Sequence, residues 1–140
     1  MPIRSRWKDQ FEIIEGNSKF HNKVREFFVT DDILRSFRAF QEVPVKDLVE
    51  DYPYTHFFDW YVEELNLVVE LHGAQHYKVV NFGNVSYEQA QEDFKSIKRR
   101  DKRKREAALE AGYFYLEISY KQYAKLTSEK LKELLFGVVQ

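Results

Sequence analysis

The chain contains no cysteine and only three prolines and five glycines. Without thiols it has neither a disulfide framework nor a zinc site built on cysteine. No apolar run approaches the ~20 residues of a membrane span, and the opening MPIRSRWKDQ has no apolar centre of the kind that a signal peptide needs. We therefore expect a cytoplasmic protein without a membrane partner.

The residues that are present indicate a folded domain. Hydrophobic residues make up 44% of the 140 positions and aromatic residues 16%, which is too apolar for a disordered chain. This length predicts a single domain, 1–140, with a real core. The formal net charge of −1 argues against a general nucleic-acid binder. The opening 1–17, with Arg4 and Arg6 beside Trp7, is either a DNA-contacting arm or a loosely packed terminus.

Two adjacent segments predict a β-hairpin. Phe57–Val62 is aromatic and β-branched, Leu67–His72 is rich in leucine and valine, and the polar link 63–66 joins them. A turn centred within that link places Asp59 directly opposite Glu70. The hairpin therefore brings two acids together that lie far apart along the chain.

The paired acids carry the strongest chemical signal. Because side chains alternate along a strand, Asp59, Glu70 and His72 share one face. Two carboxylates directly across a strand pair lie ~5 Å apart and repel each other, and a bound cation such as Mg²⁺ removes that repulsion. Gly73 then permits close approach of backbone or ligand, and His76 follows. The alternative is a polar strand end with two ordinary histidines.

The other elements follow from hydrophobic spacing and capping residues. We expect a helix over 18–29, a helical turn over 31–37, a strand over 38–45, a connection over 46–53 whose acids, Asp47 among them, are solvated, a helix over 87–111 that ends at Gly112, a strand over 113–119, a turn of helix over 123–126 and a last helix capped by Thr127 or Ser128. Ser86 with Gln89 matches a capping box for the long helix.

The long helix combines many cations with one inward acid. Steps of three and four residues from Ile97 reach Asp101 and then Lys104 on the apolar face. A buried carboxylate needs a partner, so Asp101 either forms a salt bridge or belongs to a functional site. Cations around a helix suit phosphates, whereas the alternative is a solvated charged helix. The candidate DNA-binding residues are Lys98, Arg99, Arg100, Lys102, Arg103, Lys104 and Arg105.

The order helix, strand, hairpin with Asp…Glu-x-His, basic helix, strand and helix resembles the restriction-endonuclease-like fold of the PD-(D/E)XK nucleases. It is most similar to the branch of the very short patch repair endonucleases and the phage homing endonucleases with an EDxHD pattern, in which histidine replaces the usual lysine. The matching residues are Asp59, the run Glu70-Leu71-His72-Gly73, Asp101 and the segment 112–118. The resemblance implies an α/β (α+β) protein whose central mixed sheet is flanked by helices, with its catalytic core at 57–120.

The resemblance also implies a function, a Mg²⁺-dependent DNA endonuclease that hydrolyses phosphodiester bonds, with Mn²⁺ as a substitute, in a bacterial or phage-infected cell. Asp59, Glu70 and the Leu71 carbonyl would hold the metal. His72 would take the proton from water. The catalytic set implied in this way is Asp59, Glu70, His72, His76 and Asp101.

Three differences and one further similarity qualify the comparison with this branch. No proline precedes Asp59, and the structural zinc site of the very short patch repair enzymes has no counterpart in a chain without cysteine. The acid that the branch carries on its first helix has no clear equivalent, although Glu26 is a candidate and His21 lies nearby. Gln75 with His76 resembles the Gln-His pair of related small phage nucleases.

Two other functions fit the same sequence. One is a catalytically inactive nucleic-acid-binding module on the same fold. The other is a protein-interaction domain whose basic helix meets an acidic partner. Because the chain is short for recognising a long DNA site alone, a homodimer or a separate specificity partner is expected for a sequence-specific cutter.

Overall fold

The computed structural model describes residues 19–80, 83 and 85–140. Its centre is one sheet of four strands in the order β1-β2-β3-β4. The first three strands are antiparallel neighbours and the fourth runs parallel to the third. The strands are β1 (Ala39–Pro44), β2 (Phe57–Val62), β3 (Leu67–His72) and β4 (Phe114–Ser119). The sheet is therefore mixed, which confirms the expected α+β class.

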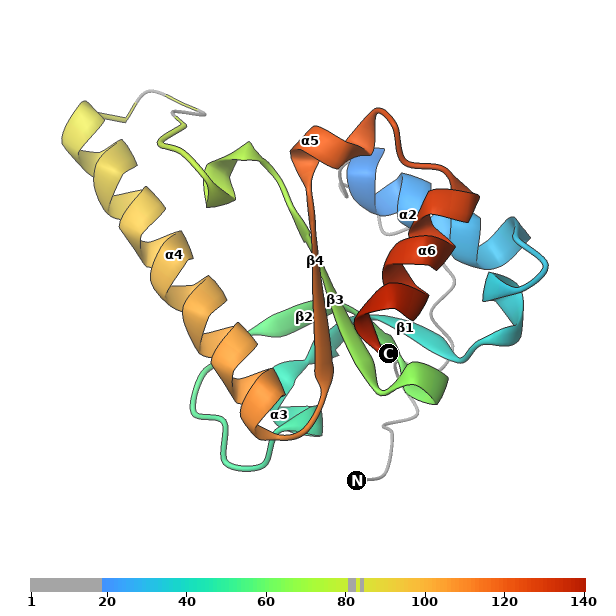
Figure 1. Cartoon of the computed structure of the whole chain (residues 1–140). Helices are drawn as coiled ribbons and strands as arrows, with labels where there is room; N and C mark the ends of the chain where they lie inside the picture. Colours follow the sequence, from blue (N-terminus) through green and yellow to red (C-terminus); the bar gives the residue numbers. More distant parts are fainter. Residues whose placement is uncertain (1–18, 81–82, 84) are drawn as a thin grey trace.

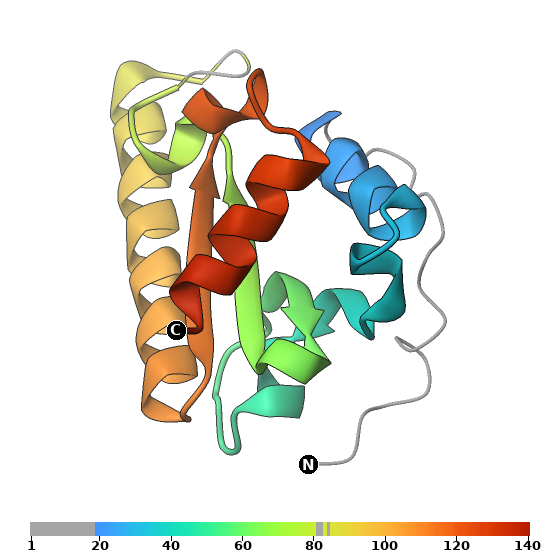
Figure 2. The same cartoon turned by 45° about the vertical axis from the view of Figure 1, so that its right-hand side comes forward.

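Helices cover both faces of the sheet, as Figures 1 and 2 show. The long helix α4 (Tyr87–Glu110) lies along one face, and α2 (Lys19–Thr30) and α6 (Ser128–Val138) cover the other. The shorter elements are the helices α3 (Val45–Leu48) and α5 (Tyr120–Tyr123) and the 3₁₀ turns η1 (Leu34–Ser36), η2 (Glu63–Leu65) and η3 (Ala74–His76). The described residues thus form three layers, with the sheet in the middle.

Alternation along the strands divides the core into two clusters. On one face of the sheet, Trp60 and Val69 pack against Phe28 of α2. On the other face, Val68 belongs to a second cluster that includes Ala108 of α4. Burial of these apolar side chains fixes α4 over the face to which every second residue of β3 points.

The hairpin forms in the predicted register. Val62 pairs with Leu67, and Trp60 pairs with Val69. Asn66 closes the turn with a φ of 50°, in the left-handed region that asparagine adopts more readily than most residues. The register therefore places Asp59 opposite Glu70, as the sequence predicts.

The long helix begins and ends where its capping residues predict. The Gln89 N–H donates to Ser86 Oγ at 3.1 Å, but the Gln89 side chain donates to Asp93, so only half of the capping box forms. Gly112 follows the helix with a φ of 92°, a conformation that favours glycine because it has no Cβ. The expected helix over 18–29 and the strands over 38–45 and 113–119 also form, with small shifts at their ends.

Two expectations for connecting segments are wrong. The segment 46–53 begins inside the helix α3, and its Asp47 is buried, with 3% exposure, because the helical turn draws it into the core beside Val45. The turn near the C-terminal helix is α5, which ends at Tyr123, where we expect it to begin. Its start moves earlier because Ser119 forms a capping box there.

Two further expectations concern a membrane and the N-terminal arm. Within 19–80, 83 and 85–140, no helix combines the length and the apolar character needed to cross a bilayer. The candidate DNA-contacting arm, 1–17, lies outside the described residues.

Candidate functional site

Carboxylates form a row across the sheet, with one acid on each strand. Glu42 and Asp59 occupy matching positions between the pairs Gln41–Trp60 and Val43–Phe58. Asp59 and Glu70 follow the last hairpin pair, Trp60–Val69, and the Asp59 N–H donates to Glu70. Glu70 in turn pairs with Glu117 of β4. We call these four residues the acid row. Because like charges directly across a sheet destabilise it, the row requires cations to compensate it.

A cavity of about 700 Å³ opens beside the two central acids. Its walls include Asp59 and Glu70 from the sheet, His21 from α2 and Lys104 from α4. Leu71, whose carbonyl the resemblance implies as a metal ligand, also lines it. Residues from both helical layers therefore reach the same opening as the hairpin acids.

Each central acid contacts the opposite strand with one oxygen and a basic side chain from a helix with the other. The Asp59 N–H donates to Glu70 Oε2 at 3.1 Å, and the Leu71 N–H donates to Asp59 Oδ2 at 2.7 Å. The second oxygens are Asp59 Oδ1, 4.0 Å from His21 Nε2, and Glu70 Oε1, which forms an ion pair with Lys104 Nζ. The backbone therefore fixes the orientation of both carboxylates.

Burial raises the pKa values of both central acids, and the charge of Asp59 raises that of Glu70 further. For Glu70, burial is the largest cause and the Asp59 charge the second, and they raise its pKa to about 8 although Lys104 opposes them. Burial also raises the pKa of Asp59. A divalent cation beside these oxygens would favour their ionised forms. Carboxylate oxygens at the wall of a cavity thus fit a Mg²⁺ ion, which prefers oxygen ligands.

The contribution of Glu70 to stability should fall as the pH rises from about 4.5 to about 8 in metal-free protein. Because the pKa of Glu70 is higher in the folded state, the folded protein keeps a proton that the unfolded chain has released. Glu70 therefore contributes its full stability below the unfolded-state pKa, and this contribution is lost as the pH rises through the folded-state pKa. A pKa difference of one corresponds to about 1.4 kcal/mol. Urea unfolding at several pH values measures this; an equally steep profile in Glu70→Gln would contradict the assignment.

Glu42 and His21 extend the site beyond the hairpin. Glu42 has a φ of 51°, a strained conformation that often occurs at functional sites in residues other than glycine. Donor atoms of Glu42, His21 and Asp59 all lie within 4.8 Å of one another. Burial lowers the pKa of His21, although the Glu42 charge opposes this. The neutral imidazole, which can accept a proton, is therefore favoured near neutral pH.

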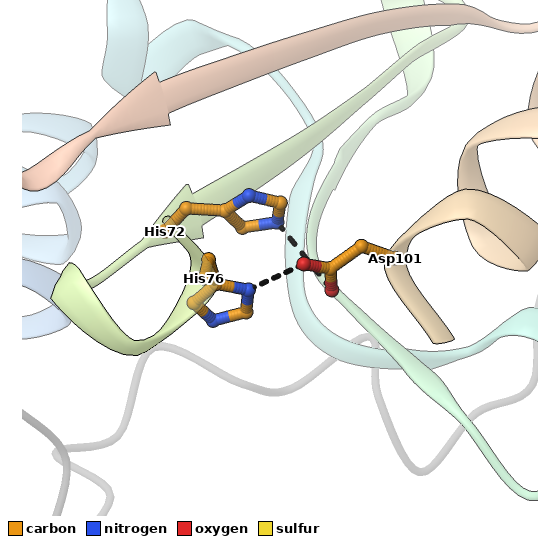
Figure 3. A group of neighbouring side chains, drawn as sticks. All are labelled: His72, His76 and Asp101. Carbon is orange, nitrogen blue, oxygen red and sulfur yellow. Dashed lines mark hydrogen bonds and ion pairs between the residues drawn. The ribbon is translucent and has the colours of Figure 1, made fainter. Parts of the chain in front are cut away.

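A second group joins β3, η3 and α4, and Figure 3 shows its members, His72, His76 and Asp101. His76 Nδ1 lies 2.7 Å from Asp101 Oδ2, His72 Nε2 lies 3.9 Å from Asp101 Oδ1, and the two rings stack with 4.0 Å between centroids. Burial alone would raise the pKa of Asp101, but the hydrogen bond from His76 and nearby charges hold it below its usual value. Asp101 thus points inward, as predicted. His76 is its nearer partner, because Arg100 Nη2 lies 3.8 Å from Asp101 Oδ1.

The predicted DNA-binding cations of α4 do not share one environment. Lys104 has 7% exposure and pairs with Glu70, so although it belongs to the candidate DNA-binding set, it neutralises the acid row instead of adding to the exposed basic surface. Arg100 is half-buried and lines the cavity of about 700 Å³ beside the central acids, which we call the larger cavity. The exposed members of the set are Lys98, Arg99, Lys102, Arg103 and Arg105.

Two of the three supporting candidates from the sequence lie at the larger cavity and one does not. Gln75 and His21 line the larger cavity, whereas Glu26, exposed on α2, is not among the described residues that line it. Glu42 of β1 rather than Glu26 supplies the additional acid. Gly73 leaves room for Gln75, because a Cβ at position 73 would lie 2.6 Å from Gln75 Oε1.

Two acids and one histidine contact were not predicted from the sequence. Glu42 and Glu117 belong to strands whose pairing partners the sequence does not identify. Glu117 lies 3.2 Å from His72 Nδ1 and accepts a hydrogen bond from the Tyr77 hydroxyl at 2.5 Å. His56 hydrogen-bonds the Tyr52 hydroxyl through Nδ1 at 2.6 Å. Alternation within 113–119 is the signal that could have put Glu117 on the same face as Glu70.

Comparison with protein-family models finds no match, and comparison with curated proteins finds none either. Function is therefore inferred from the chemistry of the site.

Proposed function

We propose that the protein is a metal-dependent DNA endonuclease that hydrolyses phosphodiester bonds. The observation that carries this proposal is the central pair of the acid row, Asp59 and Glu70, side by side at a cavity below a helix rich in cations. Buried, paired carboxylates are costly for a fold and useful as Mg²⁺ ligands, and cations suit a phosphate backbone. The element order agrees with the one expected from the resemblance to restriction-endonuclease-like nucleases, which supports the proposal.

The metal-binding residues would be Asp59, Glu70 and the Leu71 carbonyl, and Glu42 lies close enough to Asp59 to assist them. When bound, Mg²⁺ or Mn²⁺ supplies positive charge that stabilises the phosphate oxygens as negative charge develops on them. Lys104 Nζ, paired with Glu70, places a second positive charge at the same wall. Because these groups are largely removed from water, their charges act more strongly than they would at the surface.

The geometry favours His21 as the group that accepts the proton of the attacking water. Both ring nitrogens of His72, the first candidate from the sequence, have carboxylate neighbours, Glu117 at Nδ1 and Asp101 at Nε2. His21 lines the cavity with its Nε2 close to Asp59. We assign proton transfer to His21, and we assign to His72, with His76 and Asp101, the positioning of the end of β3.

Replacing His21 by alanine should lower the turnover number about 100- to 10,000-fold, the usual contribution of a general base. DNA affinity should change little. In the unmodified protein the rate should rise with pH through a pKa below 6.5, because burial favours the neutral imidazole. A pH–rate profile measures this dependence. If His72→Ala removes the rise and His21→Ala keeps it, the assignment of the base is reversed.

The cations beside the mouth of the larger cavity should contact the DNA backbone. Arg100 lines the cavity, and the guanidinium of Arg103 lies 4.5 Å from the ring centre of Tyr54. Replacing both arginines by alanine should weaken DNA binding and lower the slope of log affinity against log salt concentration by about 0.9 for each lost phosphate contact. Fluorescence anisotropy in EDTA over a salt series measures both quantities. An equal loss in Arg99→Ala, an exposed residue bonded to Ser96, would indicate diffuse binding instead.

The proposal is tested by incubating the protein with supercoiled plasmid and with branched oligonucleotides in Mg²⁺, Mn²⁺ or EDTA. Cutting that requires the metal is expected, and the products show whether one strand or both are cut. DNA binding without cutting of any substrate would indicate the catalytically inactive binding module. Absence of DNA binding at low salt would favour a protein-interaction domain.

A further inference from the structure

The carboxylate beside His72 determines which of its nitrogens can bind a metal. His72 Nδ1 lies 3.2 Å from Glu117 Oε1, and this negative charge favours the tautomer in which Nδ1 carries the proton. In a neutral imidazole the other nitrogen then has a free lone pair. Metal-binding histidines are usually held in this way, with the second ring nitrogen bonded to a carboxylate. His72 Nε2 is therefore oriented as a ligand.

The lone pair of His72 faces another acceptor. Nε2 of His72 and Oδ1 of Asp101 are both buried and, among the residues that the structure describes, neither has a hydrogen-bond partner. They lie 3.9 Å apart, too far for a direct hydrogen bond. His72 is only 3% exposed and Asp101 8%. Arg100 Nη2, 3.8 Å from the same Asp101 oxygen, is also too far for a direct hydrogen bond, so a cation between the two acceptors would be favourable.

His76 completes a three-residue group. Its Nδ1 is 2.7 Å from Asp101 Oδ2, and one donor atom from each of His72, His76 and Asp101 lies within 4.8 Å of the others. Tetrahedral zinc at about 2.0–2.1 Å from each ligand separates neighbouring ligand atoms by roughly 3.4 Å. The spacings of 3.9 Å, from His72 Nε2 to Asp101 Oδ1, and 2.7 Å, from His76 Nδ1 to Asp101 Oδ2, lie on either side of that value. Small side-chain movements would therefore bring all three donor atoms to zinc distance.

We propose that His72, His76 and Asp101 form a binding site for a transition-metal ion of the Zn²⁺ class, with Glu117 holding His72 in position. We call it the histidine site. Imidazole nitrogen suits zinc, cobalt and nickel, whereas Mg²⁺ prefers oxygen, so this site differs in metal class from the central acids. A cavity of about 340 Å³, lined by the three ligands and Glu117, offers a route of entry and room for a water as fourth ligand. The inference goes beyond the proposed nuclease function and does not depend on it.

Direct metal binding tests the histidine site. The protein, freed of any histidine tag and stripped of metal, is titrated with Zn²⁺ by calorimetry and with Co²⁺ by visible absorption, which reports tetrahedral coordination. We expect one ion per chain. Glu117→Gln, which changes a residue that holds a ligand in place, should weaken Zn²⁺ binding by roughly 10- to 100-fold. His76→Ala, which removes a ligand, should weaken it by more than that. The Co²⁺ bands should disappear in His76→Ala.

Matched controls come from the other two of the four histidines in the chain. His21→Ala and His56→Ala should bind Zn²⁺ as the unmodified protein does. Because the His72 side chain is only 3% exposed, against 11% for His76 and 33% for Glu117, His76→Ala and Glu117→Gln are the main variants, and thermal unfolding without metal checks their folding. Three results would overturn the proposal. They are no Zn²⁺ binding by the unmodified protein, binding that survives in His76→Ala, and binding that is lost in His21→Ala or Asp59→Asn instead.

Discussion

Glu70→Gln is expected to lower Mg²⁺-dependent DNA cleavage by about 100- to 1,000-fold, the loss typical of removing one electrostatic group at a reacting centre. Glu70 is 1% exposed and lies between Asp59 and Lys104. Glutamine keeps the shape and the hydrogen bond to the Asp59 N–H, but it removes the negative charge that a metal requires. The measurement is the initial rate of supercoiled plasmid cleavage at saturating Mg²⁺.

DNA affinity distinguishes a catalytic effect from a general one. In EDTA, Glu70→Gln should bind DNA about as well as the unmodified protein, because the exposed cations of α4 are unchanged. Glu106→Gln is a matched control, because its side chain is 54% exposed on the same helix and its loss should leave the cleavage rate unchanged. Cleavage by Glu70→Gln at the unmodified rate would remove this residue from the mechanism.

Replacing Lys104 by methionine is expected to destabilise the protein by about 3–5 kcal/mol, the usual cost of removing one partner of a buried ion pair. Lys104 is 7% exposed and its Nζ pairs with Glu70. Without it, Glu70 and Asp59 face each other in the core with less compensating charge. Urea unfolding at pH 9, above the raised pKa of Glu70, measures the change in the free energy of unfolding with this acid ionised.

A double-mutant cycle separates the ion pair from simple packing. In Lys104→Met with Glu70→Gln, both charges are gone and similar volumes remain, so most of the lost stability should return. Lys102→Met, an exposed neighbour on α4, should have little effect. If the double variant is as unstable as Lys104→Met alone, the loss comes from packing and not from the unpaired acid.

Periodicity in the sequence predicts the parts of the site that lie within one local unit. The hairpin fixes its own register because its turn is short, so Asp59 opposite Glu70 could be predicted and is confirmed. Helical spacing likewise predicts that Asp101 and Lys104 point inward, and both are buried. These predictions need no knowledge of which other element lies nearby.

Contacts between distant elements could not be predicted in this way. The partner of Lys104 depends on how α4 lies over β3, and the place of Glu42 depends on the pairing of β1 and on a left-handed φ that no sequence pattern indicates. The prediction that Asp47 is solvated is wrong for the same reason, because the short helix α3 that buries it is formed by packing rather than by a periodic pattern. Tertiary placement therefore supplies the rest of the site.

The central claim is that Asp59 and Glu70, the central acids of the row, hold the divalent cation used for DNA cleavage. Its most direct test is the rate of plasmid cleavage against Mg²⁺ concentration for the unmodified protein and for Asp59→Asn. Asp59 is the row member that contacts both Glu70 and His21. The prediction is a saturable Mg²⁺ dependence in the unmodified protein, no cleavage in EDTA, and loss of cleavage in Asp59→Asn that excess Mg²⁺ restores in part at most. Cleavage in EDTA, or identical Mg²⁺ curves for the two proteins, would contradict the account.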